Sequence, residues 1–475
     1  MPGPNAKKTT ESLAAQAARF LTDPRLKEPL ERLAPLANDI KSGRRNVSNL
    51  RVGEHSYVDL VVEGGGVLGI ALVGYTWALE QAGLRFRHIG GASAGAIVAL
   101  LLAALGSKDE EKSLRIVAEL ASFDLATLED GDLPGRMFKF VRRAGPLTRL
   151  AALMVLAAMI FGPIVLGCLF GWPMGGLLLL LWFADLTFLG GLVWWVLRRR
   201  GVNSGTAFTA WMTDVLYRHG VQTTGQLEDL LGTPPPDVPD PEGERWKAEL
   251  KLITAELCAE SKVVLPKDSG RYWADPRKVD PAQLLRASMS IPFFFQPATV
   301  DEPSAGGAAK DDEAGRVRHP VFVDGGLVSN FPISEFHRDD GVPPAAPTLG
   351  VRLVSYDERR REAHPQPPKN VVRFIAALFN TARFALDRSF IAKNPEYAQL
   401  VQAVDTGTHD WLAFDLSVDD QVDLFCRGVT AAVDFLDDFD WQEYLEVRKA
   451  FDVQRARLKG RQFRKGRPRP WQAEE

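Results

Sequence analysis

Short strand patterns that end at glycine clusters, each followed by an apolar helical pattern, recur in the N-terminal part of the chain. Residues 57–62 are an apolar run broken only by Asp59 and predict a strand, and residues 86–89, which lead into Gly90 and Gly91, predict a second one. Apolar positions at helical spacing follow at residues 69–82 and 96–105. Strand, glycine turn and helix, twice in succession, are typical of an α/β fold whose sheet is mostly parallel.

The α/β pattern resumes beyond residue 201 and is flanked by helical regions. A helix is predicted at residues 208–217, and strands at residues 250–257, 263–265, 320–323 and 348–354. We therefore divide the chain into an N-terminal helical arm (residues 1–56), an α/β domain (residues 57–356), and a helical C-terminal region with a basic tail (residues 357–475).

Two long apolar runs interrupt the α/β pattern. Residues 150–170 carry no charge and residues 177–197 carry only Asp185. Each run is about 20 residues long, which is enough for a helix to cross ~30 Å of hydrocarbon. Basic residues flank both outer ends: Arg142, Arg143, Arg149, Arg198, Arg199 and Arg200. The pattern predicts a transmembrane helical hairpin inserted at residues 148–199, with both ends on the cytoplasmic side of a membrane.

Other interpretations of this apolar segment stay open. It can form a buried hairpin in a soluble core, or a re-entrant hairpin that enters the bilayer without crossing it. Asp185 can be protonated, face the neighbouring helix, or meet its counterpart in another copy of the chain. The last arrangement leaves a homo-oligomer open.

Composition excludes several classes of protein. A net charge of −3 argues against bulk nucleic-acid binding, which needs a basic face. The three cysteines, Cys168, Cys258 and Cys426, form no close pair, and the seven histidines include no zinc-binding spacing. We expect no disulfide framework, no metal and no cofactor.

A G-x-S-x-G motif lies between the second predicted strand and the helix after it. It reads Gly91-Ala92-Ser93-Ala94-Gly95. Such a turn holds the serine in a strained conformation, and its small neighbours let a substrate approach the hydroxyl. The following helix directs its N-terminal N–H groups towards the same place. The motif favours Ser93 as a nucleophile, although chance matches are common in chains rich in glycine.

Three consecutive glycines, Gly64, Gly65 and Gly66, follow the first predicted strand, and Gly69 opens the next helix. Unhindered backbone N–H groups can converge on a developing negative charge, as an oxyanion hole requires. These residues also match the G-x-G-x-x-G fingerprint of dinucleotide-binding proteins, which has an acidic residue at the end of the next strand. That strand leads into glycines here. The loop therefore favours acyl transfer, with a nucleotide-binding protein as an alternative.

Asp324 follows the strand predicted at residues 320–323 and precedes Gly325 and Gly326. A carboxylate at a strand end can take the proton of a serine hydroxyl that lies within hydrogen-bonding distance. A single Asp-Gly pair is otherwise a turn signal. Its place after the other two motifs makes Asp324 the candidate base.

Together these motifs resemble the patatin-like phospholipase family. That family has a glycine-rich oxyanion loop, then G-x-S-x-G on the next strand, then Asp-Gly-Gly or Asp-Gly-Ala much later, in the order found here. Residues 287–292 and 295–297 before the aspartate, and Asn330 and Pro332 after it, fit the family pattern as well. The resemblance covers residues 57–354, apart from the apolar hairpin.

The resemblance implies an α/β/α sandwich and a lipid acyl hydrolase of the phospholipase A, lysophospholipase or glycerolipid esterase type. It implies that Ser93 and Asp324 form a Ser–Asp dyad that works through an acyl-enzyme without a metal. The loop of Gly64, Gly65 and Gly66, joined by Ala94, would form the oxyanion hole. With the predicted hairpin, such an enzyme would act on membrane lipids at the cytoplasmic surface.

One residue departs from the family pattern. Leu68 stands where many members have Arg or Lys, a position thought to help with the lipid head group, and this favours neutral lipids or simple esters as substrates. Two further alternatives stay open. A Ser–His–Asp α/β-hydrolase would use His337, His364 or His409, and a catalytically weak membrane scaffold would use the hydrolase fold to organise partners.

Overall fold

A nine-stranded sheet forms the centre of the computed structural model. The structure describes residues 17–123, 198–236, 246–300, 319–413 and 416–464, apart from positions 339 and 341. It also describes residue 238 and isolated positions between 154 and 194. The sheet order is β11-β10-β2-β3-β5-β9-β8, with β1 paired to β2 and β6 paired to β5. Its strands are β1 (Arg51–Val52), β2 (His55–Val62), β3 (Leu84–Ala92), β5 (Leu250–Glu256), β6 (Ser261–Leu265), β8 (Ala298–Thr299), β9 (Val321–Asp324), β10 (Thr348–Val354) and β11 (Val401–Asp405).

The middle of this sheet is parallel. Strands β11, β10, β2, β3 and β5 pair in parallel, whereas β6 and β9 run antiparallel to β5. All of β2 beyond His55 is buried, as expected for a central strand covered on both faces. The predicted α/β fold with a mostly parallel sheet is confirmed. Strands β4 (Gly201–Asn203) and β7 (Phe293–Phe295) form a separate two-stranded ribbon.

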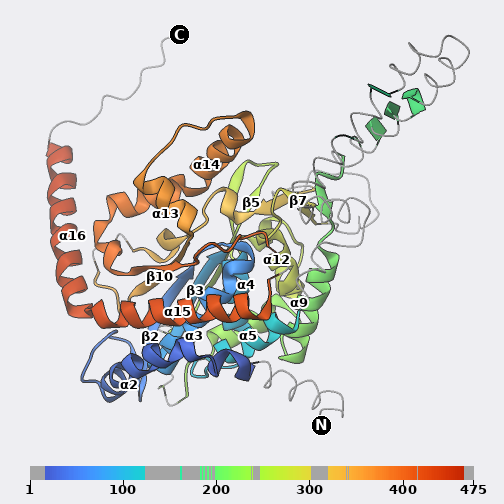
Figure 1. Ribbon diagram of the computed structural model, residues 1–475. Helices are drawn as coiled ribbons and strands as arrows, with labels where there is room; N and C mark the ends of the chain where they lie inside the picture. Colours follow the sequence, from blue (N-terminus) through green and yellow to red (C-terminus); the bar gives the residue numbers. More distant parts are fainter. Residues whose placement is uncertain are drawn as a thin grey trace, which may run out of the picture.

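Helices and short helical turns cover both faces of the sheet (Figure 1). The helices are α2 (Lys27–Ser42), α3 (Gly69–Gln81), α4 (Ala94–Ala104), α5 (Ser113–Ser122), α9 (Thr206–Arg218), α10 (Thr224–Gly232), α12 (Pro281–Ser288), α13 (Tyr356–Ala363), α14 (Val371–Lys393), α15 (Val418–Asp438) and α16 (Trp441–Arg464). Two adjacent glycines of β3 show the two faces, because successive strand residues point in opposite directions. A Cβ on Gly91 would meet Gly95 of α4, whereas one on Gly90 would meet Phe336.

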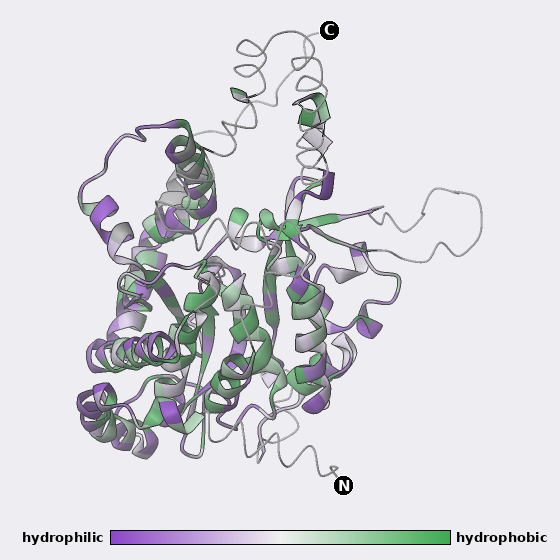
Figure 2. Ribbon diagram, turned by 45° about the vertical axis from the view of Figure 1, so that its right-hand side comes forward, coloured by the Kyte–Doolittle hydropathy of each residue, from purple (hydrophilic) through white to green (hydrophobic). Residues whose placement is uncertain are grey.

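Helices α3 and α15 pack face to face, and α2 lies against α15 (Figure 1). Glycines allow the close approach of α3 and α15. A Cβ on Gly74 of α3 would lie 2.1 Å from the carbonyl oxygen of Phe425, and one on Gly428 of α15 would lie 1.9 Å from that of Ala71. Figure 2 shows hydrophobic residues concentrated on the strands and the helices next to them, with hydrophilic residues on the outer helices. The C-terminal part of the chain is therefore packed into the core of the α/β unit.

Most predicted elements lie within a few residues of the observed ones. The strand predicted at residues 86–89 is longer, because β3 spans Leu84–Ala92 and continues until shortly before α4 begins at Ala94. Strand β11 was not predicted, and it extends the sheet by pairing with β10 from within the region expected to be helical. The segment assigned to the N-terminal arm contains the predicted helix, α2, after Pro24, but it also contains β1, which pairs with β2.

The predicted transmembrane hairpin at residues 148–199 lies almost wholly outside the described residues. Among the residues that are described, no helix is both long and apolar enough to cross a membrane. Five of the described large apolar side chains of this segment are exposed: Met154, Phe161, Phe183, Leu186 and Trp194. The hairpin stays a prediction.

Candidate active site

Ser93 occupies the sharp turn between β3 and α4. Its backbone has φ 53° and ψ −125°, a conformation that is strained for a residue with a side chain. The turn has no room for larger neighbours, since a Cβ on Gly91 would lie 2.5 Å from the carbonyl carbon of Gly95, and one on Gly95 would lie 2.3 Å from the carbonyl oxygen of Val62. The Ser93 N–H donates to Ser288 Oγ at 3.3 Å. Backbone packing and this hydrogen bond hold the serine in place.

The glycine loop lies beside Ser93, directly after β2. A Cβ on Gly64 would lie 3.0 Å from the Cβ of Ser93. The Gly64 N–H donates to the carbonyl oxygen of Asn330 at 3.0 Å. Within the described part of the chain, the N–H groups of Gly65 and Gly66 donate to no acceptor, and neither does that of Ala94 at the start of α4. Three backbone donors are thus available around the serine, as an oxyanion hole requires.

Asp324 ends β9 and faces the same turn. Its Oδ1 accepts the Gly326 N–H at 2.7 Å, and its own N–H donates to the carbonyl oxygen of Ser290 at 2.9 Å. A Cβ on Gly325 would lie 2.0 Å from the carbonyl oxygen of Ile253, so only glycine fits after the aspartate. The backbone therefore fixes the direction of the carboxylate.

Burial raises the pKa of Asp324 above its ordinary value, while the Ser93 hydroxyl, the charge of Arg383 and the Gly326 N–H each oppose the rise. Asp324 Oδ2 forms no complete hydrogen bond with any described residue. The Ser93 hydroxyl thus lies close enough to affect the carboxylate without a well-formed hydrogen bond, and catalytic pairs commonly tighten only when substrate binds. A buried carboxylate with a free oxygen beside a serine is suited to accept a proton.

Glu63 directly precedes the glycine loop, and hydrogen bonds hold its carboxyl group in place. Its Oε2 accepts the Leu353 N–H at 2.7 Å, and its Oε1 accepts Asn330 Nδ2 at 3.2 Å. Burial raises the pKa of Glu63 to about 7, although Arg352 and the Leu353 N–H oppose the shift. No motif marks this residue in the sequence, because a glutamate before a glycine loop carries no signal of its own.

Two residues of the C-terminal region contact the glycine loop from outside. The carbonyl oxygen of Trp411 accepts the Val67 N–H at 3.1 Å, and a Cβ on Gly66 would lie 2.0 Å from that oxygen. Arg383 of α14 donates from Nη2 to the carbonyl oxygen of Gly64 at 3.1 Å. Sequence reasoning missed both residues, since neither belongs to a motif.

Leu68 is buried at the end of the short helical turn η2 (Gly66–Leu68), where it packs in the core. Gly69 begins α3, and a Cβ there would lie 3.4 Å from the Cβ of Ala94. These residues close the site with apolar packing on the side of α3 and α4.

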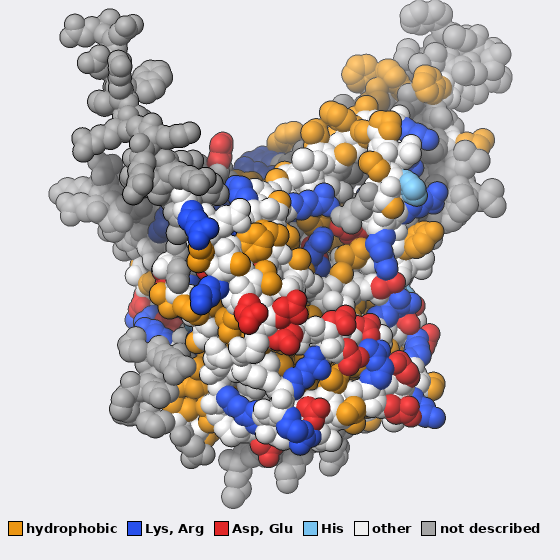
Figure 3. Space-filling view, turned by 90° about the vertical axis from the view of Figure 1, so that its left-hand side faces the viewer, with side chains coloured by type: hydrophobic (Ala, Val, Ile, Leu, Met, Phe, Trp, Pro, Cys, Tyr) orange, Lys and Arg blue, Asp and Glu red, His pale blue; other side chains and the backbone are white. Residues whose placement is uncertain are grey.

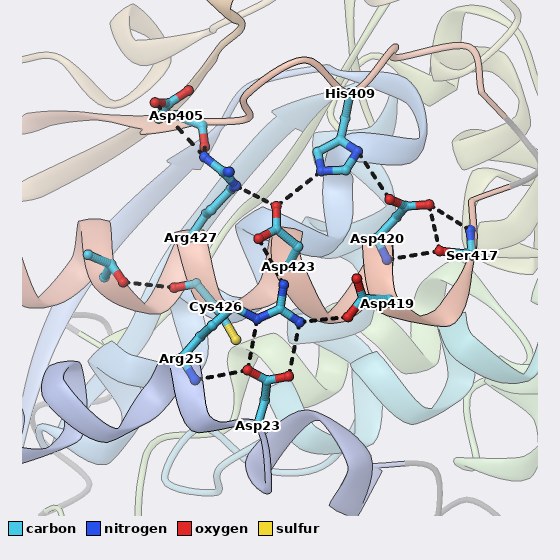
Figure 4. A network of polar contacts seen from close by, with 11 residues as sticks. Asp23, Arg25, Asp405, His409, Ser417, Asp419, Asp420, Asp423, Cys426 and Arg427 are labelled. Atoms are coloured by element: carbon cyan, nitrogen blue, oxygen red, sulfur yellow. Dashed lines mark hydrogen bonds and ion pairs between the residues drawn. The ribbon is translucent and has the colours of Figure 1, made fainter.

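The three histidines of the alternative triad lie in other surroundings than the candidate base. His337 Nδ1 lies 2.9 Å from the hydroxyl of Tyr397, and His364 is exposed at the end of α13. His409 Nε2 lies 3.1 Å from Asp423 of α15, inside a network of charged residues that ties the short helical turn η1 (Pro24–Leu26) to α15 (Figure 4). The groups that act on the carboxyl of the candidate base include no histidine. In the described part of the chain, no cluster of three or more His, Cys, Asp or Glu side chains is arranged to hold a metal ion.

The chain is similar to known proteins. YqhO of Bacillus subtilis (strain 168), an uncharacterised protein, is 27% identical over 349 residues, which cover 74% of this chain and 88% of the relative. The crystal structure of VipD from Legionella pneumophila is 14% identical, with a TM-score of 0.37 and coverage of 81% of this chain and 68% of that chain. The family model described as "Patatin-like phospholipase" matches residues 60–337, more than half of the chain, and indicates a lipid hydrolase. The chain belongs to the patatin-like phospholipase family.

Proposed function

We propose that the chain hydrolyses acyl esters of lipids with Ser93 as the nucleophile and Asp324 as its base. The observation that carries this proposal is the strained turn that places Ser93 beside the buried carboxylate of Asp324. The N–H groups of Gly65, Gly66 and Ala94, which have no acceptor among the described residues, support it, because acyl transfer needs donors for a developing oxyanion.

The reaction follows from the geometry in two stages. Ser93 Oγ bonds to the ester carbonyl carbon as its proton passes to Asp324, and the carbonyl oxygen becomes an oxyanion that accepts hydrogen bonds from the loop. The C–O bond to the alcohol then breaks, and the alcohol leaves with the proton from Asp324. Water attacks the acyl carbon and gives a proton to Asp324. The fatty acid leaves as this proton returns to Ser93 Oγ.

The experiment that tests this proposal is ester hydrolysis in mixed micelles, with free fatty acid measured from a phospholipid and from a neutral glyceride. Wild type is compared with Ser93→Ala and with the matched control Ser42→Ala, a change at an exposed serine. Release by wild type and the control, with loss in Ser93→Ala, supports the nucleophile. Equal release by all three overturns it. The better substrate tests whether Leu68 shifts preference towards neutral lipids.

We further propose that the reaction takes place at a membrane surface, and α14 supports this location. Five apolar side chains of α14 are exposed: Val371 (72%), Phe374 (52%), Ile375 (60%), Leu378 (56%) and Leu386 (55%). Its exposed charges are all basic, Arg373, Arg388 and Lys393, while its one acid, Asp387, is buried against Ser329. An amphipathic helix with a basic, apolar outer face is typical of proteins that bind anionic lipid surfaces.

Helix α14 lies at the upper edge of the molecule in Figure 1, and hydrophobic side chains gather along that edge in Figure 3, with acidic side chains lower on the same face. The double change Phe374→Ser and Ile375→Ser tests the location. It is expected to lower hydrolysis of vesicles that contain anionic lipid, relative to a monomeric short-chain ester. The control is Tyr217→Ser on α9, where the side chain is 62% exposed. An unchanged ratio in the double variant would overturn this role of α14.

A further inference from the structure

Arg383 connects the C-terminal region to both halves of the candidate site. Its Nη2 donates to the carbonyl oxygen of Gly64 at 3.1 Å and to Oδ1 of Asn330 at 2.7 Å. Asn330 in turn donates from Nδ2 to the same Gly64 oxygen at 2.9 Å. The guanidinium therefore bridges the glycine loop after β2 and the segment after Asp324, which are far apart in the sequence.

The hydrogen bond to Gly64 has a geometric consequence for the next residue. A peptide unit is planar and trans, so its carbonyl and the following N–H have a fixed relation. Two donors hold the Gly64 carbonyl, and the direction of the Gly65 N–H is thereby fixed. Gly65 has no side chain of its own that could hold its orientation, and a Cβ there would lie 2.3 Å from Leu353 Cδ1. Arg383 thus helps to aim a backbone donor.

The positive charge of Arg383 acts on two buried carboxyl groups, those of Asp324 and Glu63. In the described ranges, no Asp or Glu lies within ion-pair distance of Arg383, and its buried Nε has no hydrogen-bond partner. Its ring contacts are with Phe384 and Trp411, whose centroids lie 5.5 Å and 5.7 Å from the guanidinium carbon. The point where a Cβ on Gly326 would lie is 3.6 Å from Arg383 Nε and 2.9 Å from Asp324 Oδ1. A positive charge therefore lies near the buried carboxylate of the candidate base, where screening by water is weak and the charge acts strongly.

We propose that Arg383 is a positioning residue of the hydrolase, which holds the glycine loop in the shape that receives the oxyanion and keeps Asp324 ionised by its charge. This inference rests on the proposed function of Ser93 and Asp324. It gives α14 a second role, because the helix carries this arginine on its inner side and the exposed apolar residues on its outer side.

An uncharged fluorophosphonate probe tests this role without knowledge of the natural substrate. Attack by Ser93 Oγ on phosphorus expels fluoride, and the serine proton passes to Asp324. The rate of labelling is measured against pH for full-length wild type, Arg383→Gln, Arg383→Lys and the control Arg360→Gln, a change at an exposed arginine of α13. A thermal melt of each variant separates loss of reactivity from loss of fold.

Arg383→Gln is expected to slow labelling about 10-fold to 100-fold, as loss of support for an oxyanion donor does. It is also expected to move the acid limb of the profile to higher pH by about one unit or more, because Asp324 loses a neighbouring positive charge. Arg383→Lys keeps the charge but not the planar geometry, so labelling slows while the acid limb stays near that of wild type.

Slower labelling of Arg383→Gln with an unshifted acid limb would overturn the inference, and so would wild-type rates in both variants. If Arg383→Gln does not fold, Arg383→Lys decides alone. The inference then requires that this variant is labelled more slowly than wild type and that the acid limb of its pH profile lies at the wild-type pH. Labelling that depends on Ser93 but not on Arg383 leaves the proposed function intact. Absence of labelling in wild type would overturn both.

Discussion

Residues 60–337 and the residues that follow them contribute to the candidate site in different ways. The first region supplies the proposed reactive groups, Ser93 and Asp324, at turns where glycines touch neighbouring backbone and no side chain fits. The second supplies the side chain of Arg383 and the carbonyl of Trp411, which contact the glycine loop from outside. Backbone packing thus fixes the geometry of the candidate site, whereas its positive charge comes from a region without motifs.

The largest expected effect in this comparison comes from the base. Asp324→Asn is expected to lower kcat about 10²-fold to 10⁴-fold, the usual contribution of a general base. Its stability is expected to equal or exceed that of wild type at neutral pH, because the change removes a buried carboxylate whose pKa is raised by burial. Hydrolysis rates and urea unfolding measure the two effects, with Asp214→Asn at an exposed position of α9 as the control. Activity close to wild type would exclude Asp324 as the base.

The interface between the two regions is tested by Gly74→Ala in α3. The added methyl group would meet the carbonyl oxygen of Phe425 in α15 at 2.1 Å. We expect a loss of ~3 kcal/mol or more in the free energy of unfolding, at the upper end of overpacking costs. Gly232→Ala, where nothing lies within 4 Å of the added Cβ, is the matched control. Equal stability of the two variants would show that α3 and α15 can separate without cost.

We expect the free energy of unfolding to depend on pH through Glu63, whose Oε2 accepts a hydrogen bond from the Leu353 N–H of the second region. Burial raises its folded pKa to about 7 from 4.5, so the folded protein binds this proton more tightly than the unfolded chain does. Its contribution to stability is full below pH 4.5 and is lost as the pH rises to about 7. The loss is on the order of 3 kcal/mol.

Glu63→Gln is expected to flatten this part of the profile in urea unfolding at a series of pH values. Glu28→Gln, at an exposed position of α2, is the control and should keep the wild-type slope. If Glu63→Gln shows the wild-type slope, another group causes the pH dependence.

The smallest expected effects come from the histidines of the second region. Separate changes of His337, His364 and His409 to alanine are expected to leave hydrolysis close to wild type, because their partners are Tyr397, solvent and Asp423. His409→Ala is expected to cost up to ~1 kcal/mol of stability, since its network lies near the surface. Loss of hydrolysis in any one variant, with the fold retained, would instead favour a Ser–His–Asp triad.

Local sequence patterns were enough to predict the strands and helices whose conformation is determined by neighbouring residues in the sequence. The strands predicted at residues 57–62 and 348–354 are mostly apolar, with one charged residue each, Asp59 and Arg352, and they agree with the buried parallel strands β2 and β10. Strand β11 was missed because Val401–Asp405 is short and half polar, and only its pairing with β10 makes it a strand.

The site shows the same limit. Glycine and serine motifs pointed to the segments around Ser93 and Asp324, because only small residues fit against the neighbouring backbone at these turns. Arg383 and Trp411 could not be found in this way, since their contacts with Gly64 and Val67 span hundreds of residues and are made by an ordinary arginine and by a backbone carbonyl. Such contacts follow from the packing of α14 and α15, and nothing in the local sequence marks them.

The close crossing of α3 and α15 also bears on how the chain is made. Gly74 leaves the ribosome about 350 residues before Gly428, the glycine that fits against it. At a translation rate of ~5–20 residues per second, the apolar surface of α3 is made about 20 to 70 s before α15, the helix that covers it. The nascent chain therefore carries an incomplete core for most of its translation, and we expect it to depend on chaperones until α15 emerges.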